Sequence, residues 1–268
     1  MQTKLISIIV PAYKQGKLIA TDLTKIHQVA ENLPYDFEII CVVDGTSLDD
    51  TYKIAKQAAK KLKNVQVIGY PHNKGKGYAV RYGMAASKGD IVGFMDAGMD
   101  IDPQGLSMLL EHFNWYKADI IIGSKRHPVS IVDYPWQRKI LSFVYQQLVR
   151  ILFGLKVRDT QVGMKFYRRA VLEKVLPRLL VKKFAFDIEI LAVANALGYK
   201  RIFESPIQLK LDFGKSGITS KYFIRTVSLM IWDTLAVFYR LRIKHYYDDG
   251  NKRNWIYDPE LSLRINIP

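Results

Sequence analysis

Residues 91–103 read Ile91-Val92-Gly93-Phe94-Met95-Asp96-Ala97-Gly98-Met99-Asp100-Ile101-Asp102-Pro103. The first five residues predict a short buried strand, and three carboxylates follow it within seven residues. In an open α/β sheet, ligands bind beyond the carboxyl ends of the strands. Carboxylates clustered there suit a hard divalent cation, which takes oxygen ligands and often holds substrate phosphates. The same pattern also fits an Asp-rich turn in which Asp102 caps a helix that starts at Pro103.

The length and composition fit one large α/β domain in a reducing compartment. The chain has 268 residues, of which 49% are hydrophobic, so it can bury a full core. Its single cysteine, Cys41, lies inside an apolar run, which argues against a disulfide scaffold. The amino terminus enters a strand by Leu5, and we therefore expect no signal peptide.

A net charge of +15 predicts an anionic partner. Residues 123–158 hold seven Lys or Arg against one Asp, and residues 214–244 hold six against one. Both stretches are also rich in large apolar side chains, a combination typical of helices that lie on an anionic membrane surface. Nucleic acid would suit the charge as well, but the sequence has no recognition motif for it, and we expect no nucleic-acid partner.

Apolar runs alternate with helical patterns in the first half, as in a mostly parallel sheet covered on both faces. The predicted strands are residues 6–11, 37–43, 65–70, 91–95 and 119–123, and the predicted helices are residues 21–32, 50–62 and 76–87. The second half is less regular. It predicts helices at 134–155, 166–180, 187–197 and 221–239, a strand at 202–211 and an irregular tail at 246–268. Asp233 divides the apolar residues of the helix at 221–239 into two shorter stretches. Neither stretch reaches the roughly 20 consecutive apolar residues that a helix needs to cross a bilayer, so we expect this helix not to cross one.

Three motifs near the predicted strand ends suit nucleotide or phosphate binding. The first contains Pro11 and Tyr13 and is followed by Gln15; the second contains Asp44, whose carboxylate can accept from a base or a ribose. The third, residues 72–81, places glycines around Lys76 before a helix, and a helix N-terminus favours anions. It is not a P-loop, because its spacing differs. The alternatives are a tight turn with a helix cap at Asp44 and a solvated lysine at Lys76.

In order along the chain, these motifs resemble those of the inverting nucleotide-sugar glycosyltransferases of family 2, which have the GT-A fold. Within that family the chain is most similar to the polyprenyl-phosphate (dolichyl-phosphate) mannose and glucose synthases, over about residues 4–217. The resemblance implies an α/β GT-A domain at 1–217, followed by an amphipathic membrane-surface helix and tail at 218–268. It also implies a nucleotide-sugar donor held by Pro11, Tyr13, Gln15, Asp44, Lys76 and Asp96.

The resemblance also implies a metal site, from which this sequence departs at one position. Asp96-Ala97-Gly98 stands at the family's Asp-x-Asp motif, with Gly98 in place of the second Asp. In the polyprenyl-phosphate synthases the residue two positions further on also helps to hold the metal, and here that residue is Asp100. We therefore expect Asp96 and Asp100 to hold Mg²⁺ or Mn²⁺. Gly45 and Gln15 are two further departures from the family pattern.

Basic residues in the second half resemble the acceptor side of these synthases. They are Arg126, Arg138, Lys139 and Ser142, with Lys215 in a loop that can close over the diphosphate. Arg138 and Ser142 are four residues apart on a predicted helix, so they face the same way and can grip one phosphate together. A solvated amphipathic helix is the alternative.

Two acidic residues complete the implied catalytic set of Asp96, Arg126, Arg138, Asp187 and Glu189. Asp187 and Glu189 lie near the reacting centre or are helix N-terminal carboxylates that the dipole stabilises. Residues 159–161 and 184–191 favour the glucosyl branch of the family.

The implied reaction transfers a hexose, with inversion, from UDP-glucose or GDP-mannose to a polyprenyl or dolichyl phosphate. We expect the protein to be cytoplasmic and peripheral on the cytoplasmic face of a membrane. The alternatives are a family 2 enzyme that acts on a saccharide hydroxyl, with Asp187 or Glu189 as base, and a non-catalytic nucleotide-sugar-binding protein. The sequence does not predict an oligomeric state.

Overall fold

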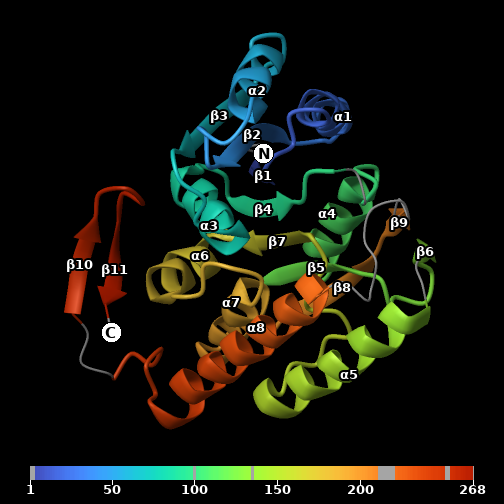
Figure 1. Cartoon of the computed structure of the whole chain (residues 1–268). Helices are drawn as coiled ribbons and strands as arrows, with labels where there is room; N and C mark the ends of the chain where they lie inside the picture. The colour runs from blue at the N-terminus through green and yellow to red at the C-terminus, as the bar shows by residue number, and fades with distance from the viewer. Residues whose placement is uncertain (1–3, 99–100, 134–135, 211–220, 251–253, 268) are drawn as a thin grey trace.

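The fold is built on a seven-stranded sheet with the strand order β3-β2-β1-β4-β7-β5-β8 (Figure 1). The computed structural model describes residues 4–98, 101–133, 136–210, 221–250 and 254–267. The strands are β1 (Leu5–Ala12), β2 (Asp36–Asp44), β3 (Val65–Tyr70), β4 (Ile91–Met95), β5 (Ile120–Ser124), β7 (Met164–Arg168) and β8 (Ile202–Pro206). All neighbours pair in parallel except β7, which is antiparallel to both β4 and β5. The predicted mostly parallel α/β sheet is thus confirmed.

Helices cover both faces of this sheet and create two buried cores. One core packs α1 (Ile19–Glu31), α2 (Thr51–Ala59) and α4 (Gly105–Trp115) on the sheet. The other core packs α3 (Lys76–Ala86), α6 (Arg169–Val175) and α7 (Phe186–Ala196) on the opposite face. Because both faces are covered, the central strand β4 is apolar and buried along its whole length.

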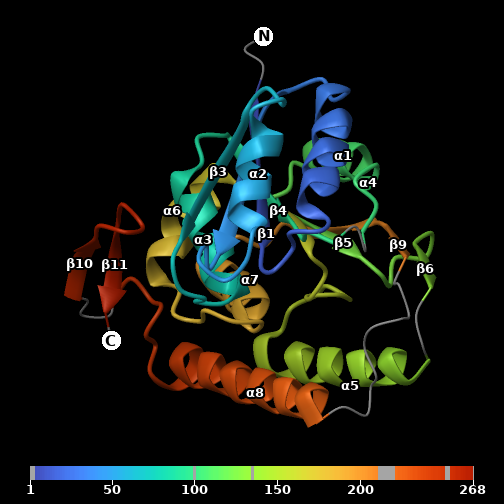
Figure 2. The same ribbon diagram turned by 45° about the horizontal axis from the view of Figure 1, so that its top comes forward.

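Two long helices extend the second core away from the sheet. These helices, α5 (Trp136–Phe153) and α8 (Lys221–Phe238), lie side by side (Figure 2), and α8 continues as a short π-helix, η2 (Tyr239–Ile243). The Tyr145 hydroxyl lies 2.7 Å from Thr234 Oγ1, and the rings of Phe153 and Phe238 pack edge to face. In the part of the chain that the structure describes, neither helix has the length and apolarity needed to cross a membrane.

Two predictions about the second half are right only in part. The helix expected at 166–180 is present as α6 and a 3₁₀ turn, η1 (Leu176–Arg178), but its first residues belong to strand β7, because pairing with β4 and β5 makes them extended. The expected strand at 202–211 is divided into β8 and β9 (Gln208–Lys210), and β9 pairs with β6 (Ile131–Asp133).

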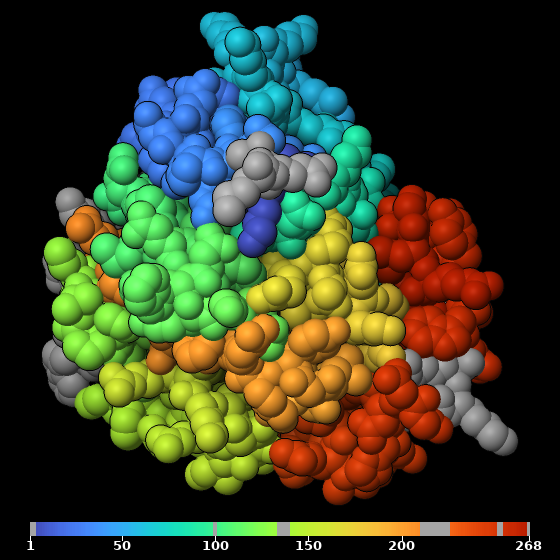
Figure 3. Space-filling view, turned by 180° about the vertical axis from the view of Figure 1, so that it is seen from behind, coloured from blue at the N-terminus to red at the C-terminus, as the bar shows by residue number. Residues whose placement is uncertain are grey.

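The tail expected to be irregular contains a hairpin. Strands β10 (Asn254–Asp258) and β11 (Leu263–Ile267) pair antiparallel. In a view from behind, this C-terminal segment lies on the flank of the molecule beside α6 (Figure 3), and β11 contacts η1. The domain boundary predicted at residue 217 falls outside the described residues and stays a prediction.

Candidate active site

A cavity of about 600 Å³ opens where strands β1, β2 and β4 end. Its other walls are the loop before α3, residues 183–184 and the helix α8. All six residues predicted for the donor side line it, namely Pro11, Tyr13, Gln15, Asp44, Lys76 and Asp96. The cavity therefore lies where ligands bind in open α/β sheets, beyond the carboxyl ends of the strands.

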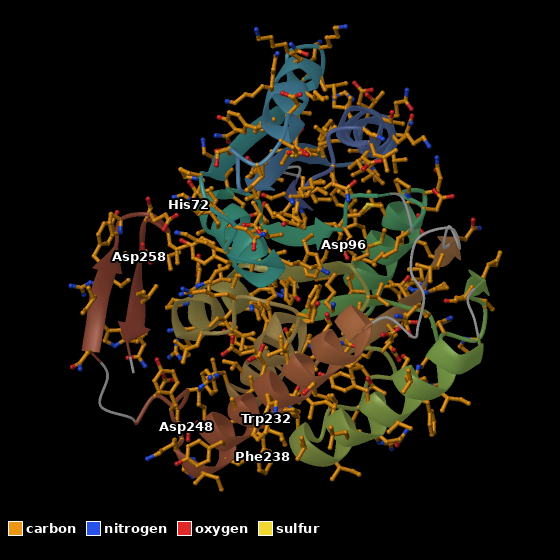
Figure 4. All side chains as sticks on the ribbon, viewed as in Figure 1. His72, Asp96, Trp232, Phe238, Asp248 and Asp258 are labelled. Atoms are coloured by element: carbon orange, nitrogen blue, oxygen red, sulfur yellow. The ribbon has the colours of Figure 1, made fainter. Side chains whose placement is uncertain are left out.

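Asp96 follows β4 directly and is held at the cavity by the segment before β7. Its backbone N–H donates to the carbonyl of Gly163 over 2.8 Å. A Cβ atom at Gly163 would lie 1.9 Å from Asp96 Oδ2, so only glycine fits there. Lys76 Nζ donates to the same Oδ2 over 2.8 Å, whereas Asp96 Oδ1 is buried and has no hydrogen-bond partner among the described residues. One carboxylate oxygen is thus left without a partner in the described part of the chain. Asp96 is labelled in Figure 4.

Asp187 joins Asp96 in a partly buried cluster of alternating charge. Its Oδ1 lies 2.5 Å from Lys165 Nζ, and its Oδ2 lies 3.8 Å from Lys76 Nζ. Lys165 comes from β7, is fully buried and also donates to the carbonyl of Val162 over 2.6 Å. Asp187 lies in the first turn of α7, where the helix N-terminus favours a negative charge. Two lysines and two carboxylates thereby compensate one another at the cavity wall.

Burial and charge act in opposite directions on the two lysines of this cluster. Burial lowers the pKa of Lys165, and Asp187 restores only part of it. Burial would also lower the pKa of Lys76, but Asp96 and Asp187 together raise it above its usual value. Lys76 is therefore a fixed cation beside Asp96 at the cavity wall.

Asp44, expected to contact a base or a ribose, holds the loop that forms the next part of the cavity wall. Its two oxygens accept from Asn73 Nδ2 at 2.8 Å, Lys74 N at 2.7 Å and Gly75 N at 2.9 Å. The Asp44 carboxylate is buried and occupied by these bonds. Its observed action is to shape residues 73–75, which precede the helix α3.

Gly98 explains why the Asp-x-Asp pattern is broken. Its φ angle is +109°, a conformation that residues with a Cβ rarely adopt, and its N–H donates to Asp22 Oδ2 over 2.8 Å. Asp22 comes from α1 and is buried. The turn after β4 is therefore anchored by a carboxylate from another helix, and an aspartate at residue 98 would be strained.

The residues at this place fit a divalent cation. No group of three or more His, Cys, Asp or Glu side chains forms a metal cluster within the described ranges. Magnesium, however, is usually bound through one or two carboxylates, several waters and the phosphates of a substrate. The buried Oδ1 of Asp96, which has no partner among the described residues, is available as such a ligand. Asp100, the second predicted ligand, lies outside the described residues. Asp102 accepts from the N–H of Gln104 at the turn before α4, which begins at Gly105 rather than at Pro103.

Part of the predicted acceptor side comes together around Arg126. Its Nη2 donates to Ser142 Oγ over 3.0 Å, and its guanidinium lies 5.7 Å from the centre of the Phe143 ring. A second cavity of about 620 Å³ lies here, and its lining contains four cations and no carboxylate in the described part of the chain: Arg126, Phe143, Gln146, Gln147, Arg150, Lys156, Val157 and Arg158. Arg138 and Lys139 belong to α5, but their side chains are outside the description, as is all of Lys215.

The Glu189 side chain contacts the C-terminal segment rather than the first cavity. Its fully buried carboxylate accepts from the N–H groups of Leu180 and Val181 at 2.8–3.0 Å and from the Tyr247 hydroxyl at 2.6 Å. Arg240 Nη1 lies 3.7 Å away. Burial raises the pKa of Glu189, although these hydrogen bonds oppose the shift. Glu189 joins the C-terminal segment to the core and is absent from the described lining of the first cavity.

Sequence reasoning assigned no role to Lys165, Gly163, Asp22 or the cavity-lining Phe184. A lysine between apolar residues of a strand was a usable signal for Lys165, because a buried ammonium needs a carboxylate partner. The contact between Asp22 and the turn at Gly98 spans 76 residues and leaves no local pattern.

The family described as "Glycosyl transferase family 2" matches residues 7–176, more than half of the chain. The chain belongs to this family. The matched residues run from β1 through η1 and include Asp44, Lys76, Asp96 and Lys165.

Curated relatives of this family 2 chain include dolichyl-phosphate β-glucosyltransferases. That of Drosophila melanogaster is 32% identical over 206 residues, covering 72% of this chain and 63% of the relative. The human protein of the same name is 31% identical over 209 residues, covering 72% and 64%. The glycosyltransferase AglD of Haloferax volcanii is 27% identical over 241 residues, covering 89% and 38%. The chain thus spans less than two thirds of the length of these relatives.

Solved structures share the fold of this family 2 chain at low sequence identity. Glucosyl-3-phosphoglycerate synthase from Mycobacterium tuberculosis, in complex with Mn²⁺, UDP and phosphoglyceric acid, gives a TM-score of 0.66 at 19% identity, covering 99% of this chain and 87% of that one. Mannosyl-3-phosphoglycerate synthase from Rubrobacter xylanophilus gives 0.69 at 16%, covering 98% and 86%. The predicted GT-A fold is confirmed.

Proposed function

We propose that the chain transfers a hexose, with inversion, from a nucleotide-diphosphate sugar to a polyprenyl phosphate. The observation that carries this proposal is its 32% identity to a dolichyl-phosphate β-glucosyltransferase over 206 residues. Glucose is the favoured sugar, because several relatives carry that name. UDP-glucose is then the first donor to test, followed by GDP-mannose.

The donor side of the proposed reaction is the first cavity. Pro11, Tyr13 and Gln15 line one wall, where they can contact the nucleotide. Lys76 places a fixed positive charge beside Asp96, suited to the diphosphate. A Mg²⁺ or Mn²⁺ ion, when held by Asp96 together with Asp100, would stabilise the charge of the leaving nucleoside diphosphate.

The acceptor side of the proposed reaction is the basic region around Arg126. A lipid monophosphate is already an anionic nucleophile near neutral pH, so it needs positioning and partial charge compensation. Arg126 and Ser142 are in contact and can bind one phosphate, and we place Arg138, Lys139 and Lys215 in the same group. Asp187 is paired with Lys165, which suits a structural charge better than a free general base. Glu189 is left out of the proposed catalytic set because its carboxylate is occupied elsewhere.

The paired helices α5 and α8 are the proposed membrane-contacting surface. Exposed apolar side chains on α5 and α8 include Phe143, Val144, Ile151, Leu229 and Trp232. Trp232 is labelled on α8 in Figure 4. Nearby Arg150, Lys156 and Arg158 add positive charge, and each contributes about 1 kcal/mol near an anionic lipid surface. We place the protein peripherally on the cytoplasmic face of such a membrane.

Vesicle binding tests the membrane surface. The protein should pellet with phosphatidylglycerol-rich vesicles at low salt and be partly released at high salt, since the Debye length is about 10 Å at 0.1 M. Neutral vesicles serve as the control. Equal binding to both vesicle types at all salt concentrations would assign the attachment to apolar contacts alone, and no binding to either would contradict this surface.

An acceptor comparison tests the reaction itself. Transfer from radiolabelled UDP-glucose and GDP-mannose would be measured to a polyprenyl monophosphate, to the matching polyprenol and to soluble saccharides. We expect transfer to the monophosphate with inverted anomeric configuration. Preference for the alcohol or a saccharide would replace the proposal by a hydroxyl-directed enzyme. Nucleotide-sugar binding without any transfer would support a non-catalytic binding protein.

A further inference from the structure

The C-terminal hairpin contacts the loop that forms part of the donor cavity. Lys74 Nζ donates to both carboxylate oxygens of Glu260, at 2.6 and 2.5 Å. These residues are 186 positions apart in the chain. Figure 4 labels Asp258 at the end of the hairpin that is nearer to His72, the residue before this loop. The C-terminal hairpin thus contacts residues 73–75 through the ion pair between Lys74 and Glu260.

Lys74 is held between aromatic rings as well as by Glu260. Its ammonium lies 4.6 Å from the centre of the Tyr78 ring and 5.3 Å from that of Tyr70, both cation–π distances. Its backbone N–H donates to Asp44, so the main chain at Lys74 is tied to β2 while its side chain is tied to the hairpin. The neighbours Asn73 and Gly75 line the donor cavity, but Lys74 is absent from the described lining.

The hairpin turn is itself rigidly placed. Leu261 is 2% exposed and belongs to the same core cluster as Tyr70 and Tyr78. Asp258 Oδ1 accepts from the N–H groups of Glu260 and Leu261, at 2.9 and 3.2 Å. The backbone of Glu260 is therefore held by Asp258 on one side and by the buried Leu261 on the other.

We propose that Glu260 is a positioning residue that holds the loop 73–75 in its donor-binding conformation through Lys74. This inference rests on the proposed donor site in the first cavity. If Lys74 were released, Asn73 and Gly75 would keep their bonds to Asp44 but lose their outer support. The expected consequence is a lower affinity for the nucleotide sugar, whereas the rate of the chemical step is unchanged.

The test is a comparison of the full chain with Glu260→Gln. We expect the KM for the nucleotide sugar to rise about fivefold, with kcat and the acceptor KM within about twofold of the wild-type values; fivefold is the upper end for a partly exposed ion pair. Reversal of the pair, Lys74→Glu with Glu260→Lys, should recover most of the loss seen in Lys74→Glu alone. An unchanged donor KM in Glu260→Gln, or a fall in kcat alone, would overturn the proposal.

The control is Asp249→Asn, which removes a second ion pair of the C-terminal segment, that with Arg178. We expect it to leave the donor KM within about twofold of wild type. An equal rise in both variants would overturn the specific role of Glu260, because general loosening of the segment would then suffice.

Hydrogen exchange separates this inference from the proposed function. The amides of Lys74 and Gly75 should exchange about fivefold faster in Glu260→Gln than in wild type, without any ligand. If wild type failed to bind UDP-glucose or GDP-mannose, the proposed function would fall, and the exchange rates alone would decide whether Glu260 holds the loop. Unchanged exchange would refute that support in either case.

Discussion

Asp187 and Glu189 begin on the same turn of α7 and serve two different regions of the molecule. The Asp187 carboxylate joins the cavity-side cluster, defined as Asp96, Asp187, Lys76 and Lys165, in which two lysine ammonium groups lie within 4 Å of it. The Glu189 carboxylate joins the tail-side cluster, defined as Glu189, Tyr247, Arg240 and the N–H groups of Leu180 and Val181. Both side chains are buried.

The difference between these clusters lies in what is left unoccupied. The cavity-side cluster contains an oxygen, Asp96 Oδ1, that has no partner within the described ranges, beside a cavity of about 600 Å³. The tail-side cluster has hydrogen bonds to both oxygens of its carboxylate. A buried polar group whose hydrogen bonds are all made stabilises a fold. A polar group at a cavity that has an unused acceptor oxygen is available to a ligand. Changes in the first cluster should therefore affect activity, and changes in the second should affect stability.

The largest expected effect is that of Asp96→Asn. We expect kcat to fall by at least about a hundredfold, because a neutral amide is a poorer cation ligand and no longer balances Lys76. Turnover would be measured across a Mn²⁺ titration, with calorimetric UDP binding as a second readout. Near-wild-type turnover at saturating Mn²⁺ would remove Asp96 from the proposed metal site.

The next effect concerns Asp187→Asn. Lys165 would lose its only carboxylate partner within the described residues, and Lys76 would lose one of two. We expect kcat to fall at least about tenfold, with a further loss of stability of about 3 kcal/mol, because an unpaired buried charge is costly. Steady-state kinetics and urea unfolding measure the two quantities. A variant that lost stability but kept full kcat would place Asp187 with Glu189 and erase the comparison.

Glu189→Gln should affect stability alone. We expect the free energy of unfolding to fall by about 1–3 kcal/mol, because an amide NH₂ would face backbone N–H donors. Urea unfolding would measure this loss, and kcat should stay within about twofold of wild type at a temperature where both proteins are folded. A tenfold loss of kcat in the folded variant would return Glu189 to the catalytic set.

The smallest expected effect is on the pH dependence of stability. Burial raises the folded-state pKa of Glu189 above its usual value of 4.5, so the folded protein holds a proton on this carboxyl more tightly than the unfolded chain does. Its contribution is thus fully present below pH 4.5 and declines as pH rises through the folded-state pKa. The stability difference between wild type and Glu189→Gln should therefore be largest at acidic pH and shrink toward neutrality. A difference that grew with pH in urea titrations would show that the hydrogen bonds outweigh burial.

Local pattern was sufficient for the parts of the fold that local spacing controls. The strands β1 to β4 and the helix at Lys76 were predictable because apolar runs, glycines and helix starts repeat in sequence. Strand β7 was not, since its apolar spacing is compatible with a helix and only pairing with β4 and β5 makes it extended. The hairpin of β10 and β11 was also missed, and its segment was expected to be an irregular tail.

The candidate site was predictable wherever a side chain follows its own strand. Asp44 and Asp96 could be placed at the sheet edge from the sequence, since parallel strands end there together. What each carboxylate binds depends on residues that are distant in the chain, such as Lys165 for Asp187 and Tyr247 for Glu189. Asp187 and Glu189 are separated by one residue and have the same local sequence pattern. Their different surroundings could therefore be found only from the structure.

The insertion of β7 between β4 and β5 has a consequence for synthesis on the ribosome. The sheet order β3-β2-β1-β4 can be completed once residue 95 has emerged, but β5 has no neighbouring strand until β7 arrives about 40 residues later or β8 still later. We expect nascent chains that end before residue 164 to expose β5 to protease while β1 to β4 are already protected. Strand β7 also carries Lys165. The cavity-side cluster can therefore form only after β7 has joined β4 to β5.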